Sequence, residues 1–313
     1  MEPLRIVFMG TPEFAVASLE AIVEAGLPVV GVITAPDKPA GRGMKLTESA
    51  VKKYAREKGL YILQPEKLKN EEFLGQLRAL QADLQIVVAF RMLPEVVWTM
   101  PPMGTVNLHG SLLPQYRGAA PINWAVINGE KETGVTTFQL QHDIDTGSIL
   151  LQDRFPIADT DTAGDVHDRM KVIGARLLVK TIEGLAAGNL KSVPQENPMG
   201  LKHAPKIFTE TGKIDWNKPA EEIYNLIRGL SPFPTAYTEL EGKVLKIYRA
   251  ERVVHALAPD AAPGVYDSDG RTYLRFAASD GYIRVTELQL EGKKRMPVGD
   301  FLRGYRFNNL PEH

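Results

Sequence analysis

The stretch Arg5-Ile-Val-Phe-Met-Gly-Thr-Pro-Glu13 begins the pattern that decides the fold. Its first residues are typical of a buried strand, and Pro12 suits the first position of a helix. Apolar residues then recur at helical spacing as far as Val23, and Gly26 provides a natural helix end. Residues 28–34 form a second apolar run. The segment therefore predicts a strand–helix–strand unit, and with it a parallel sheet with a right-handed crossover.

This alternation continues to about residue 187 and predicts an α/β domain with a Rossmann-like, mostly parallel sheet. The first turn lacks Gly-x-Gly-x-x-Gly, which argues against a dinucleotide site and a nicotinamide-dependent dehydrogenase. Helices are predicted over residues 47–58, 70–80, 94–98, 121–128 and 162–187, and strands over 61–63, 84–89, 133–139 and 148–155, with a further strand from Thr105.

Composition changes over residues 190–206, where proline, glycine and polar residues are typical of a linker. We therefore predict a catalytic domain over 1–189 and a C-terminal domain over 207–313. Many short strands separated by turns favour a small OB-like β-barrel, a fold that often binds nucleic acid but also serves as an inert appendage. These strands are predicted near residues 235–240, 243–254, 263–267, 272–276 and 282–290, after a helix over 219–229.

Composition sets limits on function. The 313 residues include no cysteine, which excludes disulfides and thiolate catalysis. A formal charge of −1 gives no global reason to expect nucleic acid, so a polyanion site would have to be a local patch. No signal peptide and no apolar run long enough for a membrane span is recognised, and we expect a cytoplasmic protein that acts as a monomer without a membrane.

The chemistry points to Thr105-Val-Asn-Leu-His-Gly-Ser-Leu-Leu-Pro-Gln-Tyr-Arg-Gly118, an apolar strand that runs into a turn. Alternate side chains of a strand share a face, so Asn107 and His109 point the same way. The amide can donate to a developing oxyanion, and the imidazole can exchange a proton near neutral pH. Asp145 can orient or charge that imidazole. The three groups at the strand ends of a parallel sheet suggest acyl transfer.

Each of these pieces also has a purely structural interpretation. An Asn-x-His pair on a strand is often a satisfied structural pair. Asp145-Thr-Gly147 is often only a turn, in which Asp accepts backbone N–H groups and Gly takes a positive φ. An aspartic protease would need two such carboxylates, and the sequence has no second Asp-Thr-Gly, so we reject that possibility.

Residues 35–46 interrupt the regular pattern with a connection longer than α/β units usually have. The segment contains the cations Lys38, Arg42 and Lys45, and glycines flank Arg42. It is interpreted either as a solvated loop or as a flexible arm that becomes ordered on an anionic partner. Phe90-Arg-Met-Leu-Pro94 follows a central strand, where a flat ligand can pack against side chains and bond to the main chain.

The Asn107-Leu-His109 and Asp145-Thr-Gly147 motifs alone resemble the wider group of 10-formyltetrahydrofolate-dependent formyl transferases, which also act on a ribonucleotide and on amino sugars. Further motifs are Met9-Gly-Thr-Pro-Glu-Phe-Ala15, Asp37-Lys-Pro-Ala-Gly-Arg-Gly43, Tyr116-Arg-Gly-Ala-Ala-Pro121 and Ile214-Asp-Trp216. With these motifs the sequence resembles, over nearly its whole length, the methionyl-tRNA formyltransferase family.

The resemblance implies transfer of the formyl group of 10-formyltetrahydrofolate to the α-amine of methionyl-initiator tRNA, without a metal. It implies that Asn107, His109 and Asp145 are catalytic. Folate contacts are implied at Phe90, Met92, Leu93, Ser111, Leu112, Leu113, Pro114 and Asp143. Contacts to tRNA are implied at Lys38, Arg42, Lys45 and Lys206, with the C-terminal domain holding the acceptor arm.

Two alternatives remain open at this point. One is the same chemistry on another amine, such as a sugar nucleotide or a ribonucleotide. The other is a non-catalytic RNA-binding protein, built from the cationic segment and the barrel, whose tRNA binding is indifferent to folate and to His109.

Overall fold

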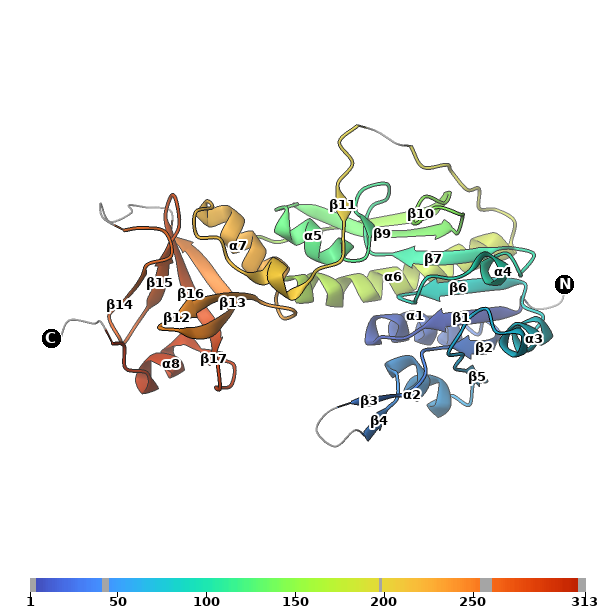
Figure 1. Ribbon diagram of the computed structural model, residues 1–313. Coiled ribbons are helices and arrows are strands. Elements are labelled where there is room, and N and C mark those ends of the chain that lie inside the picture. The colour runs from blue at the N-terminus through green and yellow to red at the C-terminus, as the bar shows by residue number, and fades with distance from the viewer. Residues whose placement is uncertain (1–3, 41–44, 197–198, 254–260, 309–313) are drawn as a thin grey trace. The chain divides into compact units, whose positions relative to one another are not determined.

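A computed structural model describes residues 4–40, 45–196, 199–253 and 261–308 of the chain (Figure 1). The chain divides into two units, each built from several segments. The chain passes from the first unit to the second for the last time after His203, which lies within the predicted linker over 190–206. The division into a catalytic and a tRNA-binding domain stays a prediction. The first unit holds residues 1–118, 134–155 and 167–203, and the second holds residues 119–133, 156–166 and 204–313.

The first unit is organised around a seven-stranded sheet with the order β10–β9–β7–β6–β1–β2–β5. The pairs β1–β2, β1–β6, β2–β5 and β6–β7 are parallel, and β7–β9 is antiparallel. The prediction of a mostly parallel, Rossmann-like sheet is therefore confirmed. Its strands are β1 (Ile6–Gly10), β2 (Val29–Ile33), β5 (Ile62–Leu63), β6 (Leu84–Val88), β7 (Thr105–His109), β9 (Glu132–Gln139) and β10 (Ile149–Pro156).

The direction of strand addition reverses at β1. The chain passes from β1 to β2 and β5 on one side, and then returns to β6 and β7 on the other side. In open α/β sheets, ligands bind in the crevice outside the carboxyl ends of the strands at such a reversal. The carboxyl ends of β1 and β6 are therefore the place to look for a ligand pocket.

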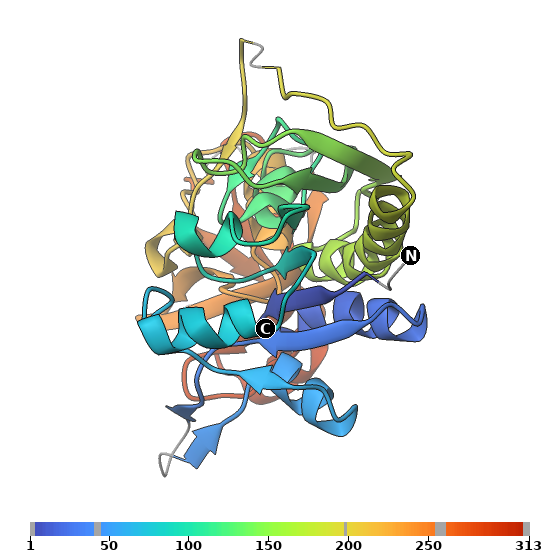
Figure 2. The ribbon, with the colours of Figure 1, turned by 90° about the vertical axis from the view of Figure 1, so that its right-hand side faces the viewer.

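Helices cover both faces of this sheet, with α3 and α4 on one side and α1 and α6 on the other (Figure 2). Side chains of α3 and α4 pack with Val7, Met9 and Val87 of the sheet in one buried cluster. Before α2, the Ser49 side chain accepts the N–H of Lys52 and so defines the first turn. The helices are α1 (Glu13–Glu24), α2 (Ala50–Glu57), α3 (Glu71–Ala79), α4 (Glu95–Trp98) and α6 (Ala163–Ala186).

The cationic segment differs from its prediction. β3 (Lys38–Ala40) and β4 (Lys45–Thr47) form an antiparallel hairpin where the sequence suggested a loop or flexible arm. The predicted helix start at Thr47 is also wrong, because Thr47 pairs with Lys38 in the hairpin and α2 begins only at Ala50. Strands of three residues are too short to show a period of two, so the sequence pattern could not reveal them.

The second unit contains a curled antiparallel sheet with the order β12–β13–β16–β15–β14, and β17 pairs with β16. Within the described residues, β12 and β14 stand at its open ends, so the predicted OB-like barrel is a half-barrel. Trp216 stacks on Phe276 in its core, with ring centroids 4.9 Å apart. The strands are β12 (Ala236–Leu240), β13 (Lys243–Val253), β14 (Tyr266–Ser268), β15 (Leu274–Ala277), β16 (Tyr282–Leu290) and β17 (Met296–Pro297).

Among its described residues, the second unit also contains three whole helices and a 3-10 turn. Helices α5 and α7 pack against each other, and Asn123 donates to the carbonyl of Gly229 at 2.8 Å. These elements are α5 (Pro121–Ile127), α7 (Ala220–Gly229), α8 (Val298–Gly304) and η1 (Thr209–Gly212). A separate two-residue pair joins β8 (Arg117–Gly118) to β11 (His203–Ala204). None of the helices described here is both long and apolar enough to span a bilayer.

Candidate active site

β7 brings the two predicted polar side chains to the carboxyl end of the sheet. His109 is buried, with 7% of its side chain exposed, and Asn107 is partly exposed. Apart from the segments that the structure leaves undescribed, no group hydrogen-bonds the Asn107 amide. A partly buried side-chain amide with unused donors, two residues before the end of β7, is suited to receive a polar atom of a ligand.

The ring of His109 has one nitrogen in a fixed hydrogen bond and one facing a carboxylate. Nε2 lies 2.9 Å from the carbonyl oxygen of Tyr116. A carbonyl only accepts hydrogen bonds, so Nε2 must carry the proton of that bond. Nδ1 lies 3.8 Å from Oδ2 of Asp145, too far for a direct hydrogen bond. Nδ1 is therefore the ring nitrogen left for proton transfer, and a carboxylate stands beside it.

Asp145 is held by its backbone more than by its side chain. Its φ is +56°, and Oδ2 accepts the N–H of Gly118 at 3.0 Å. The expectation that the glycine of this turn takes the positive φ is wrong, because Asp145 takes it instead. Gly147 is required for a different reason: a Cβ atom there would lie 1.6 Å from the carbonyl oxygen of Gln139.

The turn after β7 is fixed by hydrogen bonds from β9. Ser111 is fully buried and its hydroxyl donates to the Gln115 carbonyl at 2.6 Å, so this hydroxyl already has a partner. Thr136 donates to the Ser111 carbonyl and accepts the N–H of Leu113. Leu113 is buried, whereas Leu112 and Pro114 are partly exposed. The predicted folate contacts in this turn are thus divided between its interior and its surface.

A pocket of about 660 Å³ lies at the carboxyl ends of β1, β2 and β6, where the strand order reverses. It is lined by Thr11 after β1, Ala35 after β2 and Phe90 after β6, together with Lys38 of the hairpin. Two predicted site residues, Phe90 and Lys38, therefore line one pocket. A second pocket, of about 990 Å³, is lined by the predicted residues Met92 and Leu93 and by side chains of α3 and α4.

The loop that carries Asp143 and Asp145 lies beside α4. Nε2 of His142 is 3.1 Å from Glu95, and its ring is 5.9 Å from that of Trp98. In the same loop Asp143 is exposed, and Ile144 is 61% exposed. The 90–93 segment and the Asp145 loop are therefore neighbours on the first unit, with exposed apolar side chains on each.

A partly buried ion pair anchors the hairpin, and no local sequence pattern indicates its partners. Asp37 accepts from Lys52 at 2.5 Å and from Gln64 at 2.8 Å, and Gln64 also donates to the Ala35 carbonyl at 2.9 Å. These bonds from Lys52 and then Gln64 lower the pKa of Asp37 below its ordinary value. The motif Asp37-Lys-Pro-Ala had pointed to this segment, but the partners are 15 and 27 residues away.

The predicted tRNA contacts have mixed outcomes. Lys38 is exposed at the start of β3, and Lys206 is exposed with its ammonium 5.5 Å from the centre of the Phe208 ring. Lys45 belongs to β4, but its side chain is not described, and Arg42 lies outside the described residues.

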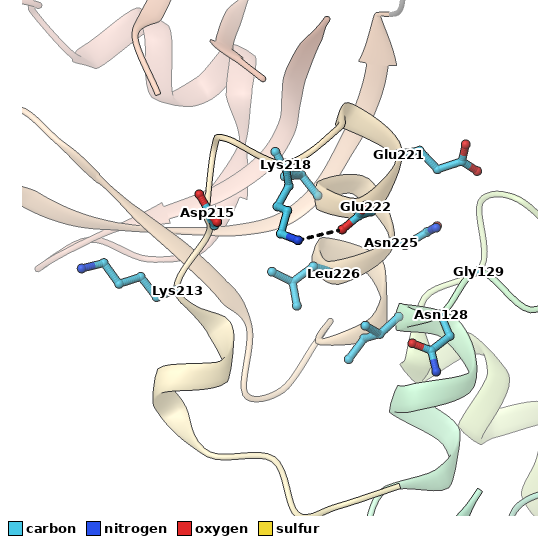
Figure 3. Close-up of a pocket in the computed structure, with 11 residues that line it drawn as sticks. Asn128, Gly129, Lys213, Asp215, Lys218, Glu221, Glu222, Asn225 and Leu226 are labelled. Carbon is cyan, nitrogen blue, oxygen red and sulfur yellow. Dashed lines mark ion pairs between the residues drawn. The ribbon is translucent and has the colours of Figure 1, made fainter. Parts of the chain in front are cut away.

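A further pocket, of about 570 Å³, belongs to the second unit and contains no predicted site residue (Figure 3). Lys218 faces Glu222 there, at 3.6 Å. Glu221 pairs with Arg252 at 3.2 Å, and Asp215 is bonded by Asn217, which lowers its pKa. Most charged groups of this pocket already have partners, so the pocket lacks a free acid–base pair.

Within the part of the chain that the structure describes, no group of three His, Cys, Asp or Glu side chains is arranged to bind a metal.

Comparison with models of known protein families identifies the class of protein to which the chain belongs. The model of the formyl transferase domain matches residues 4–182, and that of the formyl transferase C-terminal domain matches residues 206–306. The chain therefore belongs to the formyl transferase family.

Curated relatives narrow the resemblance to one enzyme of that family. A methionyl-tRNA formyltransferase of Phocaeicola vulgatus is 59% identical over 313 residues, covering 97% of this chain and 96% of its own. Another, of Parabacteroides distasonis, is 58% identical over 315 residues, covering 97% of each chain. The resemblance predicted from sequence is confirmed, and the chain is an enzyme of this kind.

Solved structures share the fold at lower identity. A sugar 3N-formyl transferase in the presence of dTDP and 5-N-formyl-THF has a TM-score of 0.67 at 21% identity, covering 94% of this chain and 100% of its own. An N-formyltransferase from Helicobacter canadensis, in complex with folinic acid and dTDP-3-aminofucose, has a TM-score of 0.66 at 20% identity, with the same coverage. At these identities the likeness concerns the fold alone.

Proposed function

We propose that this protein transfers the formyl group of 10-formyltetrahydrofolate to the α-amine of methionyl-initiator tRNA. The observation that carries the proposal is the approach of His109 and Asp145 to 3.8 Å, on the strand and loop that also present Asn107. High identity to methionyl-tRNA formyltransferases over nearly the whole chain supports tRNA as the acceptor.

The first step is attack of the neutral amine on the formyl carbon, which places negative charge on the formyl oxygen. The unused donors of the Asn107 amide would stabilise this oxyanion. A protonated Nδ1 of His109, on the same strand two residues away, would add positive charge near this oxygen. Both groups would stabilise negative charge that develops only during the attack. Such interactions are stronger in the transition state than in the ground state, so they accelerate the chemical step.

Proton transfer then completes the reaction without another reactant. The amine loses a proton to Asp145, directly or through a water, and the folate nitrogen gains a proton from Nδ1 of His109 as the C–N bond breaks. The 3.8 Å between Asp145 and Nδ1 lets a proton pass between them through a small adjustment or one water. Nε2 does not take part, because it donates to the Tyr116 carbonyl.

Folate would bind between the 90–93 segment and the Asp145 loop. Met92 is 73% exposed and Ile144 is 61% exposed, and large apolar side chains on two neighbouring segments suit a flat heterocycle. Phe90 and Leu93 pack partly into the cluster beneath. The folate donor supplies the formyl group and the leaving nitrogen, while these residues hold and orient it.

The acceptor end of tRNA would approach through the hairpin. Lys38 is exposed and lines the pocket at the reversal of strand order, so a phosphate near that pocket would meet a cation. The bonds from Lys52 and Gln64 to Asp37 hold the base of the hairpin against α2.

The test is a side-by-side assay of amines. Purified protein and 10-formyltetrahydrofolate are incubated with methionyl-initiator tRNA, with an amino-sugar nucleotide and with glycinamide ribonucleotide, and formylated product is measured. We expect rapid formylation of the tRNA only, and loss of it in His109→Ala. Formylation of either nucleotide but not of the tRNA would overturn the proposal. Binding of tRNA without turnover, equal in wild type and His109→Ala, would favour a non-catalytic RNA-binding protein.

A further inference from the structure

A segment with linker composition is bonded to the candidate active site. Val193 and Ile149 form an antiparallel bridge in which each N–H donates to the other carbonyl, at 2.7 and 2.8 Å. The bridge adds residue 193 to the beginning of β10 and brings Gln195 to the Asp145 turn. Residues 193–195 thus contact β10 and the Asp145 turn through main chain as well as side chain.

The side chain of Gln195 uses every hydrogen-bonding position it has. Nε2 donates to the carbonyl oxygens of Asp145 and Gly147, each at 2.8 Å. Oε1 accepts from Nε and Nη2 of Arg117, at 3.1 and 2.8 Å. Carbonyls only accept and a guanidinium only donates, so the amide can be oriented in only one way.

These four bonds join the two segments that place the Asp145 carboxylate. Arg117 directly precedes Gly118, whose N–H donates to Oδ2 of Asp145. Gln195 holds the other segment by the carbonyls on both sides of Thr146, in the turn where Asp145 has its positive φ. The carboxylate therefore stands 3.8 Å from Nδ1 of His109 between two supports that Gln195 links.

We propose that Gln195 is a positioning residue for the reaction, which acts by fixing Asp145 relative to His109. The inference rests on the proposed function, since it requires Asp145 to take part in catalysis. Gln195 itself would act through Asp145 and not through contact with either substrate. A shift of about 1 Å in a catalytic group is enough to cost on the order of 10²-fold in rate, so loss of this support should reduce turnover.

The first variant is Gln195→Glu, which keeps the size of the side chain and its acceptor toward Arg117. It replaces the donating nitrogen by a charged oxygen that faces two carbonyls, so it exchanges both bonds to the Asp145 turn for repulsion. We expect kcat to fall about 10- to 100-fold, with KM for folate and for tRNA unchanged. Gln195→Met, which removes all four bonds at similar length, gives an independent second variant. Glu196→Gln, an exposed neighbour with the opposite charge change, is the matched control and should leave kcat unchanged.

A double-mutant cycle separates positioning from a general structural role. In an Asp145→Asn background, Gln195→Glu should cost little further activity, because the group it positions has already been disabled. An equal fold-loss in both backgrounds, or an unchanged kcat in both Gln195 variants, would overturn the inference while leaving the proposed function intact. A wild-type protein that fails to formylate methionyl-tRNA would overturn the two together.

Discussion

Asp145 in the first unit and Glu241 in the second are carboxylates in similar backbone settings with opposite degrees of hydrogen bonding. Each residue has a positive φ, +56° for Asp145 and +50° for Glu241, and each accepts a main-chain N–H. Glu241 accepts the hydroxyls of Tyr266 and Tyr305 in addition, and all three of its bonds are 2.7 Å long. Among the described residues, the Asp145 carboxylate accepts only the bond from Gly118, with His109 at 3.8 Å.

The difference separates a structural carboxylate from a reactive one. Burial opposes ionisation of Glu241, but the bonds from Tyr305, Tyr266 and Asn308 outweigh it and lower its pKa. A carboxylate so fully bonded has little capacity left for a substrate proton. Asp145, whose second oxygen has no partner among residues 4–40, 45–196, 199–253 and 261–308, keeps that capacity. Variants at each carboxylate test this contrast in solution.

The largest effect is expected for Asp145→Asn. The amide cannot accept the proton that leaves the amine, and general acid–base groups typically contribute about 10²- to 10⁴-fold, so we expect kcat to fall within that range. Thermal unfolding should change little, because within the described part of the chain this side chain accepts a single hydrogen bond, from Gly118. The matched control is Glu241→Gln, the same chemical change at the structural carboxylate, which should keep its turnover. Equal activity of Asp145→Asn and wild type would erase the contrast.

Asn107→Ala tests the oxyanion donor on the same side of the comparison. Loss of one such donor typically costs about 10²- to 10³-fold in rate, so kcat should fall by that factor with unfolding behaviour retained. The measurement is steady-state formylation of methionyl-tRNA together with thermal denaturation. Asn128→Ala, which removes an exposed amide after α5, serves as the control. Near-normal turnover of Asn107→Ala would show that the oxyanion is stabilised elsewhere.

Glu241→Gln is expected to lower the stability of the protein and to leave the rate of formylation unchanged. Three donors converge on this carboxylate, and replacing a charged acceptor by an amide leaves at least one of them poorly paired. We expect the free energy of unfolding to fall by about 1–3 kcal/mol, measured by urea denaturation. Activity per folded molecule should be unchanged. If the variant is as stable as wild type, the cluster is not a structural anchor.

The same contrast explains how much of the molecule the sequence could predict. Strand β7 and the buried strands around it follow from local apolar runs, and the Glu241-Gly242 turn follows from residue type, so these elements were predicted. The donors to Glu241 come from residues 25, 64 and 67 positions away. No local pattern encodes such partners, so the structural role of Glu241 could not be predicted.

The candidate site shows the same limit. Asn107, His109 and Asp145 were selected because their chemistry is unusual at strand ends, and the structure brings His109 and Asp145 together. Gln195 was missed because its neighbours have the composition of a linker, while its partners Asp145 and Arg117 lie 50 and 78 residues away. Reactive side chains can be recognised from their residue type, whereas the residues that position them are brought close only by the fold.

The smallest effect concerns the alkaline limb of stability, and it tests Glu241 through its partner. Burial first, and then the bond to Glu241, raise the pKa of Tyr266 from its ordinary value of 10.0 to about 12. The folded protein therefore holds this proton more tightly than the unfolded chain. Its stabilising contribution is fully present below about pH 10 and is lost as the pH rises toward about 12.

Tyr266→Phe should consequently show a shallower loss of unfolding free energy between about pH 10 and about pH 12. Phenolate absorbance of the folded variant should lack one late-titrating tyrosine. In Glu241→Gln, that tyrosine should titrate earlier, because the negative partner is gone. A wild-type alkaline slope in Tyr266→Phe would mean that the hydroxyl is not held by Glu241, and the two carboxylates would then be less different than their geometry indicates.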